Sequence, residues 1–346
     1  MTAIQRVSSA ICNMTNDKVI GKDINDISVV VQGGVSATTA DVLRGLRTAF
    51  PNAEIVLSTW ENSDLGGLDY DKVVLSPDPG AQMAYEAVGV YNNVNRQLIS
   101  SAAGVNTATR SYILKTRTDI FIKSAAFLNC FGKYDGQAPY IFQNRLLICN
   151  YYTRNPRVQS VCFHPSDWLL FGRAEDVRLF YADFSLQTDE EAVWFKTRRK
   201  DSLLYENYLS RFTPEQYIFL SFLRRFQDIE IDCYYSSSPE LRRLTEELYA
   251  KCFVVLDYRA ELDIKFSKYD PNRYFEKYLL ISHWQWHALY QRYCEDTASF
   301  RWMLYLLFSR LARFSYGLRQ NTVALLDRLN LKEPLKQCLN GRKKSV

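Results

Sequence analysis

The chain has 346 residues, a net charge of +5 and 8 cysteines. This length suffices for a substantial hydrophobic core, in one large domain or two smaller ones. The modest charge, without a long basic run, argues against a nucleic-acid-binding protein. No C-x-x-C pair and no basic, apolar leader occur, so we expect reduced thiols in a cytoplasmic protein, with neither a disulfide scaffold nor a zinc site.

Three short apolar runs near the amino terminus predict strands, the first of them a buried parallel strand, and each has a polar or turn-forming carboxyl end. The runs are residues 27–33, 53–57 and 72–75. Val42, Leu46 and Ala49 recur at helical spacing between the first two runs, so we expect a helix over residues 38–50.

A second helix is expected from about residue 84 to residue 103, followed by a strand over residues 112–122. The order β-α-β-β-α-β predicts an α/β fold, with a mostly parallel, Rossmann-like sheet flanked by helices. Because crossovers between parallel strands are right-handed, the polar carboxyl ends gather at one edge of such a sheet, and ligands bind outside that edge.

The predicted strand over residues 112–122 carries three charges inside an apolar run. Side chains alternate between the faces of a strand, so Lys115, Arg117 and Asp119 are predicted to share one face. Two cations and a carboxylate would meet where the strand ends, which suits a diphosphate and a Mg²⁺ or Mn²⁺ ion. The alternative is an edge strand with a solvated charged face.

Six short motifs follow one another along the chain. They are VVVQGG at residues 29–34, LSTWE at 57–61, NNVNRQ at 92–97, LKTRTD at 114–119, SDWLLFG at 166–172 and TPEQY at 213–217. In this order they resemble the WavE family, which is associated with bacterial lipopolysaccharide synthesis and is similar to nucleotide-sugar glycosyltransferases of the GT-A type.

The resemblance implies a GT-A-like nucleotide-sugar-binding and catalytic domain over residues 25–230, followed by a mainly helical region over residues 231–346. It implies a hexosyltransferase-like enzyme that moves a sugar from a nucleotide-sugar donor to a growing cell-surface polysaccharide, such as lipopolysaccharide core, O-antigen or capsule. The expected partners are that donor and a saccharide or lipid-linked saccharide acceptor.

For donor binding, the resemblance points to the loops after the first strands. Gln32 precedes Gly33, whose backbone can approach a ribose or base. Trp60 can stack, and Glu61 can accept hydrogen bonds from hydroxyl groups. Arg96 lies in the first turn of a helix, where a guanidinium can meet a phosphate, although a surface salt bridge is the alternative.

GT-A enzymes are expected to carry an Asp-x-Asp metal motif, and this chain departs from it because Arg117 stands in the first acidic place. Asp119 alone remains to hold a divalent cation, Mn²⁺ or Mg²⁺. In the alternative interpretation, Lys115 and Arg117 neutralise the leaving diphosphate without a metal.

Asp167 is the predicted catalytic base, because an acceptor hydroxyl must lose its proton as it attacks the anomeric carbon. The alternative is a helix cap or turn residue. The resemblance makes Glu215 a second catalytic candidate. The residues alone favour a helix start, with Thr213 as the cap, Pro214 in the first position and Glu215 in the first turn.

The three histidines give weaker signals. His164 is either a turn residue before Pro165 or a residue near the active site, three positions from Asp167. His283 and His287 have the spacing of a metalloprotease helix, but the flanking tryptophans favour a packed aromatic surface.

Four helical segments are predicted after residue 231, at residues 240–253, 273–294, 299–316 and 322–329. The third carries an apolar stripe, which we interpret as core; a helix at an anionic membrane surface is the alternative. The stripe consists of Phe300, Met303, Leu304, Leu307 and Leu311, with Arg301, Arg310 and Arg313 nearby.

No apolar run reaches the roughly 20 residues of a membrane span, so we expect a cytoplasmic protein, with peripheral contact at the inner membrane face as the further option. Two functions from different classes remain. One is the glycosyltransferase, and the other is a non-catalytic saccharide- or nucleotide-binding component of a polysaccharide assembly complex.

Overall fold

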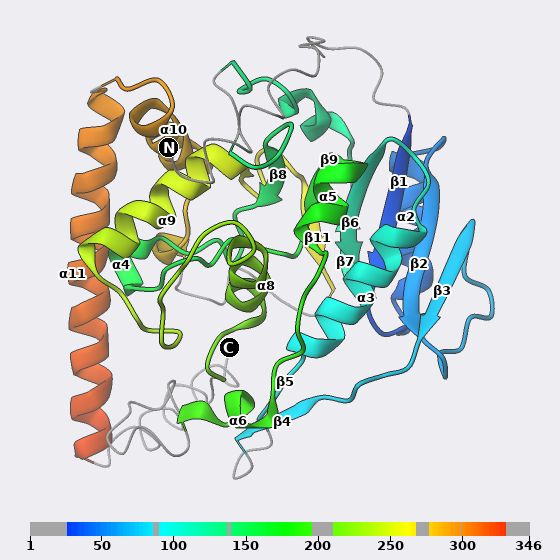
Figure 1. The fold of residues 1–346 in the computed structure, drawn as a ribbon, viewed down its shortest axis with the longest axis horizontal. Helices are drawn as coiled ribbons and strands as arrows, with labels where there is room; N and C mark the ends of the chain where they lie inside the picture. Colours follow the sequence, from blue (N-terminus) through cyan, green and yellow to red (C-terminus); the bar gives the residue numbers. More distant parts are fainter. Residues whose placement is uncertain are drawn as a thin grey trace, which may run out of the picture.

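The computed structural model describes residues 26–85, 90–136, 140–195, 210–267, 277–297 and 299–329. Within these residues, seven strands form the central sheet, in the spatial order β10-β8-β9-β6-β1-β2-β3 (Figure 1). The strands are β1 (Ile27–Gln32), β2 (Glu54–Trp60), β3 (Lys72–Ser76), β6 (Tyr112–Arg117), β8 (Leu146–Cys149), β9 (Leu170–Arg173) and β10 (Phe253–Leu256).

All neighbouring strands in this sheet pair in parallel, except that β9 runs antiparallel to both β6 and β8. The antiparallel direction of β9 changes which residues reach the ligand-binding edge of the sheet. The amino end of β9 lies beside the carboxyl end of β6, so the residues that precede Leu170 reach the edge where the parallel strands end.

Helices cover the sheet and are held by apolar contacts. These are α2 (Thr39–Ala49), α3 (Val94–Thr107), α5 (Ala174–Phe180) and α8 (Pro214–Leu223). Helix α2 buries Val42, Leu43 and Leu46. Helix α3 packs across β1 and β2, and at Gly104 it comes so close that an added Cβ would lie 2.4 Å from Val30 Cγ1. The expected α/β class is therefore confirmed.

The helix predicted from residue 84 begins later in the structure. A hairpin of β4 (Gln82–Tyr85) and β5 (Val90–Asn92) precedes α3, and residues 86–89 lie outside the described part. The aromatic and β-branched residues of this segment favour paired strands. Helix α3 then begins at Val94, after Asn92 accepts a hydrogen bond from its backbone N–H.

The strand predicted over residues 112–122 is broken in two. Strand β6 ends at Arg117, and β7 (Ile120–Ile122) pairs with β11 (Ile264–Phe266) instead of continuing in the main sheet. Thr118 begins the turn between the two strands, where its backbone N–H still donates to Gln32 O and its hydroxyl donates to Gly34 O.

The remaining described elements are short or lie towards the carboxyl end: η2 (Ala126–Cys130), α4 (Pro156–Gln159), α6 (Asp189–Ala192), α9 (Pro239–Cys252), η4 (Lys277–Leu279), α10 (His283–Tyr293) and α11 (Phe300–Arg328). The region after residue 231 is mainly helical, yet β10 joins the main sheet and β11 pairs with β7. One hydrophobic core includes residues from both parts of the chain.

The interpretation of the apolar stripe as core is wrong for most of its members. Helix α11 is one continuous element along one side of the molecule (Figure 1), and it is Tyr305 that enters the core. The exposed members of the stripe are Phe300, Met303, Leu307 and Leu311. A search of the described helices finds none with the length and apolarity needed to cross a bilayer.

Candidate functional site

The carboxyl ends of β1, β2 and β6 meet at one edge of the sheet, as the sequence predicts. Gln32 lies opposite Ser58 on one side and Arg117 on the other. The backbone N–H of Gly33 donates to Ser58 O over 3.0 Å, and Gly33 has φ +120°, a conformation that side-chain-bearing residues rarely adopt. The loops that follow these three strands therefore form one connected rim.

A buried ion pair lies beside this rim. Lys115 has no exposed surface, and its Nζ lies 3.5 Å from Asp167 Oδ2, in a side chain that is 2% exposed. Lys115 Nζ also donates to the backbone oxygen of Asp167 over 2.5 Å. Burial is the largest influence on the lysine and lowers its pKa, while the charge of Asp167 opposes that shift.

The side-chain oxygens of Asp167 are held by the charge of Lys115 and not by a hydrogen bond from the described residues. Among the described residues, neither of its oxygens accepts a hydrogen bond, although both are buried. The ion pair with Lys115 offsets part of the cost of burying this carboxylate, and buried side-chain oxygens that accept no hydrogen bond are uncommon in folded proteins. The carboxylate therefore has free acceptor capacity at the edge of the sheet where ligands bind in this class of fold.

Arg117 and Asp119 form a bidentate pair at the end of β6. Arg117 Nε and Nη2 each donate to one oxygen of Asp119 over 2.9 Å. The guanidinium also lies over the ring of Trp168, 4.3 Å from its centroid. The three side chains fix one another, and they join the turn after β6 to the segment before β9.

Trp168 also connects this pair to Glu215 at the start of α8. Trp168 Nε1 donates to Glu215 Oε1 over 3.2 Å. Burial of the carboxyl group and the nearby charge of Asp167 together raise the pKa of Glu215 to about 7. Two neighbouring carboxyl groups thus belong to one site, and Glu215 holds a proton part of the time at neutral pH.

His164 approaches Glu215 from the other side. Its Nε2 lies 3.8 Å from Glu215 Oε2, and its Nδ1 lies 2.9 Å from Tyr152 O. Burial lowers the pKa of His164 to about 3, so the ring is neutral near pH 7. A neutral ring that donates from Nδ1 to Tyr152 O leaves Nε2 as an acceptor facing Glu215.

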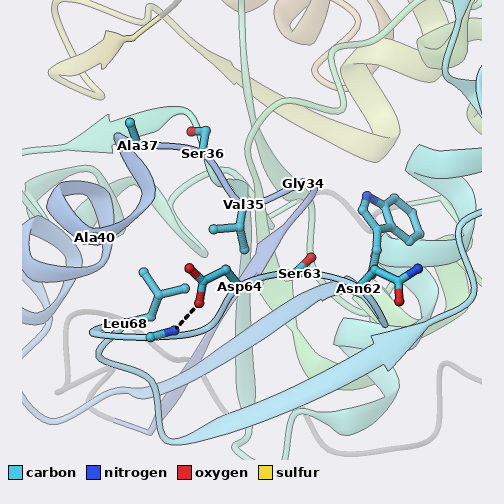
Figure 2. A pocket seen from close by; sticks show the side chains of 11 residues that line it. Gly34, Val35, Ser36, Ala37, Ala40, Asn62, Ser63, Asp64 and Leu68 are labelled. Atoms are coloured by element: carbon cyan, nitrogen blue, oxygen red, sulfur yellow. Dashed lines mark hydrogen bonds between the residues drawn. The ribbon is translucent and has the colours of Figure 1, made fainter.

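A second feature lies along the same rim, in front of β1 and β2. An open pocket of 540 Å³ is lined by the loops after these strands and by the start of α2. Figure 2 shows Ser36, Ser63 and Asp64 around it. The pocket is joined to the turn after β6, because Gly34 lines the pocket and accepts the Thr118 hydroxyl over 2.9 Å.

The predicted donor residues divide into two groups. Trp60 lines the pocket, and its Nε1 lies 3.7 Å from where a Cβ added to Gly34 would be. The Gln32 side chain instead turns towards α3, where its Oε1 accepts from Ser100 Oγ over 2.7 Å. Glu61 is exposed, and it does not line the pocket.

Arg96 is tied to a residue on the loop after β3. Its Nε and Nη2 donate to the two oxygens of Asp78 over 2.7 and 2.6 Å. The side chains remain about one-third exposed, at 33% and 35%. This is the surface salt bridge that the sequence left as the alternative.

The residues around Asp119 do not fit a resident divalent cation. Both oxygens of Asp119 accept from Arg117, and a hard cation needs about six oxygen ligands. In the part of the chain that the structure describes, no three His, Cys, Asp or Glu side chains lie close enough together to hold a metal.

Several aromatic residues of the site have no motif that would identify them. The Tyr181 ring lies 5.7 Å from Lys115 Nζ. Tyr151 and Tyr152 each pack on Trp168 with ring centroids 5.1 Å apart. The antiparallel pairing of β8 and β9 brings Tyr151 and Tyr152 to Trp168. No local spacing in the sequence predicts that contact.

His283 and His287 belong to a packed aromatic surface. His283 stacks on Trp286 with ring centroids 5.5 Å apart, and its Nδ1 lies 2.7 Å from Val255 O. His287 Nδ1 lies 2.9 Å from an Arg301 nitrogen. These contacts favour the packing interpretation of the pair over the metal-binding one.

Comparisons with known proteins give two findings. The family model for WavE lipopolysaccharide synthesis matches residues 27–316. Among solved structures, an active-site mutant of LgtC matches with 12% sequence identity and a TM-score of 0.28, over 44% of this chain and 59% of that chain. The match thus spans less than two thirds of the LgtC chain. No curated protein sequence matches significantly.

Proposed function

The chain belongs to the WavE lipopolysaccharide synthesis family, and on that premise we propose that it is a glycosyltransferase that transfers a sugar from a nucleotide-sugar donor to a cell-surface saccharide acceptor. The observation that carries the proposal is the Asp167 carboxylate. It is buried, pairs with Lys115 and accepts no hydrogen bond from the described residues, at the same edge of the sheet as the pocket after β1 and β2.

The pocket suits the nucleotide part of the donor. Trp60 offers an aromatic face for stacking, and Gly34 lets a ligand approach the backbone. Ser36, Ser63 and Asp64 offer hydroxyl and carboxylate groups to the ribose. The turn at Thr118 connects this pocket to Arg117. A diphosphate can replace Asp119 as the partner of the Arg117 guanidinium.

Asp167 is then the base that accepts the proton of the attacking hydroxyl. Lys115 offers a nearby positive charge to this buried carboxylate, while the hydrogen bond from Nζ goes to the backbone oxygen of Asp167. A single base of this kind suffices for a direct displacement at the anomeric carbon. Lys115 acts through Asp167, which it contacts at both the side chain and the backbone oxygen, so we assign it a positioning role.

Glu215 acts through Trp168. Its carboxyl group holds the indole N–H, and the indole in turn supports the guanidinium of Arg117. The proton that Glu215 carries near pH 7 reduces repulsion with Asp167. In this proposal Glu215 is a positioning residue, and electrostatic stabilisation of the departing diphosphate comes from Arg117.

Purified full-length protein tests the proposal with a panel of nucleotide sugars. We expect a nucleotide sugar to raise the melting temperature, because a ligand that binds only the folded state stabilises it. We also expect slow release of the nucleoside diphosphate as water replaces the acceptor. Stabilisation without any turnover, even with saccharide acceptors present, would support the non-catalytic binding component instead.

A further inference from the structure

Helix α11 has a hydrogen-bonded face towards the body of the protein. Tyr305 OH donates to the buried Glu246 Oε1 over 2.6 Å, and Asn155 Nδ2 donates to Ser309 Oγ over 3.2 Å. Farther along, Gln159 Nε2 donates to Tyr316 OH over 3.4 Å. Polar contacts of this kind fix the rotation of the helix about its axis, and so they fix which residues point outward.

The outward face of α11 is apolar along its length. Phe314 is 73% exposed and Phe300 is 68% exposed. The other exposed apolar residues of the helix are Met303, Leu307, Phe308, Leu311, Leu318, Leu325 and Leu329. Residues three, four and seven apart share one side of a helix, so these side chains form a continuous stripe opposite Tyr305 and Ser309. A patch of this kind marks an interaction site.

Trp284 on the neighbouring helix α10 widens the stripe. It is 39% exposed, and its ring packs against Phe308 with centroids 5.4 Å apart. An exposed tryptophan at the margin of an apolar surface is typical of contact with a membrane interface, where its ring sits at the level of the head groups.

Basic residues flank the stripe. Between residues 300 and 322 the helix carries Arg301, Arg310, Arg313 and Arg319, all exposed, and no acidic residue. At 100° per residue these arginines fall beside the apolar stripe, where long cationic side chains can reach lipid phosphates while the apolar residues enter the acyl boundary.

We propose that the outer face of α11, with Trp284, is a docking surface for an anionic phospholipid bilayer, on which the helix lies parallel to the membrane plane. The positive charge of the α11 arginines favours a lipid surface over a second copy of this chain as the partner. Over residues 300–322, two such faces packed together would bring arginines near arginines with no acidic partner, whereas an anionic surface attracts these arginines.

The length of α11 fits this orientation. Its 29 residues extend over roughly 40 Å, so the stripe can engage the surface over several turns. The inference goes beyond the proposed catalytic function and does not depend on it, because none of these residues belongs to the sheet-edge site. If both hold, the protein works on an acceptor presented at the membrane surface.

Vesicle flotation with the full chain tests the docking surface. Vesicles of phosphatidylethanolamine and phosphatidylglycerol should carry the protein, and vesicles of phosphatidylcholine alone should bind it about tenfold more weakly. Phe314→Glu should weaken binding to the anionic vesicles about tenfold or more, since it puts a carboxylate into the stripe. Leu186→Glu, which alters an exposed leucine away from α11, is the matched control and should bind like the wild type.

Each remaining outcome is decisive. Arg310→Gln combined with Arg313→Gln should weaken binding to the anionic vesicles and leave weak binding to the neutral vesicles unchanged. Circular dichroism of every variant checks that the fold persists. Binding that is equal for Phe314→Glu and the wild type would overturn the proposal. So would a stable dimer that Phe314→Glu dissociates, in a protein that ignores both kinds of vesicle.

Discussion

The sheet-edge site and the outer face of α11 reverse the usual distribution of side chains in opposite ways. At the sheet edge, Lys115, Asp167 and Glu215 bring charge into the interior. On α11, residues such as Phe300 and Phe314 bring aromatic rings into solvent. Buried charge and exposed apolar surface are both unfavourable unless something offsets them, so each is a reason to look for a ligand.

The two regions differ in how they arise from the sequence. The α11 stripe is local, because every residue in it follows from one helical repeat. The sheet-edge site joins residues about 50 positions apart, since Lys115 and Asp167 meet only because β9 runs antiparallel to β6. The comparison predicts that changes at the sheet edge affect stability and catalysis strongly, whereas changes on α11 leave the isolated protein almost unaffected.

Lys115→Met should have the largest effect on stability. It leaves Asp167 buried without its cation, and breaking a buried pair in this way costs about 3–5 kcal/mol. Urea unfolding measures the loss. Lys123→Met is the control, because it breaks an exposed pair with Asp263 and should cost about 1 kcal/mol or less.

A second variant sharpens that test. Lys115→Met combined with Asp167→Leu removes both charges, so much of the lost stability should return, without activity. A Lys115→Met protein that is as stable as Lys123→Met would mean that the pair is not a buried ion pair in solution.

Glu215→Gln should change how stability depends on pH. The pKa of Glu215 is raised from 4.5 to about 7, so the folded protein holds more protons than the unfolded chain in that range, and stability falls as pH rises through it. The full loss above pH 7 is on the order of 3 kcal/mol. Glutamine retains an acceptor for Trp168 Nε1 and removes the titration, so the variant should be more stable than the wild type at pH 8.

Thermal or urea unfolding at several pH values, with exposed Glu61→Gln as the control, measures this difference. His164, with a pKa lowered to about 3, contributes stability that is lost as pH falls from about 6.5 towards 3. The comparison at pH 8 lies above that range, so the titration of His164 does not contribute to it. Parallel curves for the wild type and Glu215→Gln would contradict the raised pKa.

Arg117→Ala should weaken binding of a nucleoside diphosphate by about 1–3 kcal/mol and leave binding of the nucleoside nearly unchanged, because only the diphosphate meets the guanidinium. Arg96→Ala is the matched control, since Arg96 is committed to Asp78, and it should change neither affinity. Calorimetry gives both values. An equal loss for nucleoside and diphosphate would exclude the phosphate role of Arg117.

Chelation of divalent cations should have the smallest effect. Because Arg117 holds both oxygens of Asp119, we expect turnover in EDTA to stay close to that in Mg²⁺ or Mn²⁺. Abolished turnover that returns with added Mn²⁺ would instead mean that the donor displaces Arg117 and that Asp119 binds the metal.

The sequence predicted the parts of the fold that depend on local periodicity. Apolar runs identified β1, β2 and β3, and the Val42 spacing identified α2. It missed the hairpin β4–β5, because strands of four and three residues carry little periodic signal. It placed the α11 stripe in the core, because periodicity indicates that a face is apolar without indicating what covers it.

For the candidate site, residue chemistry selected residues that the fold brings to one sheet edge, and only the fold supplies their pairing. Asp167, Arg117 and Asp119 came from charge placed in apolar surroundings, and all three lie at one sheet edge. The sequence placed Lys115 beside a donor, whereas the structure buries it against Asp167. The contacts of Tyr181 with Lys115 and of Tyr151 with Trp168 join segments that are distant in sequence, and no local pattern predicts them.

Turnover by Asp167→Asn tests the central claim most directly. Asparagine keeps the shape of the side chain and removes its basicity, so turnover on the acceptor should fall on the order of 10² to 10⁴-fold, while donor affinity barely changes. Asp176→Asn, a change at a buried carboxylate away from the site, controls for general loss of stability. An Asp167→Asn enzyme that retains most of its turnover would contradict the assignment of Asp167 as the base.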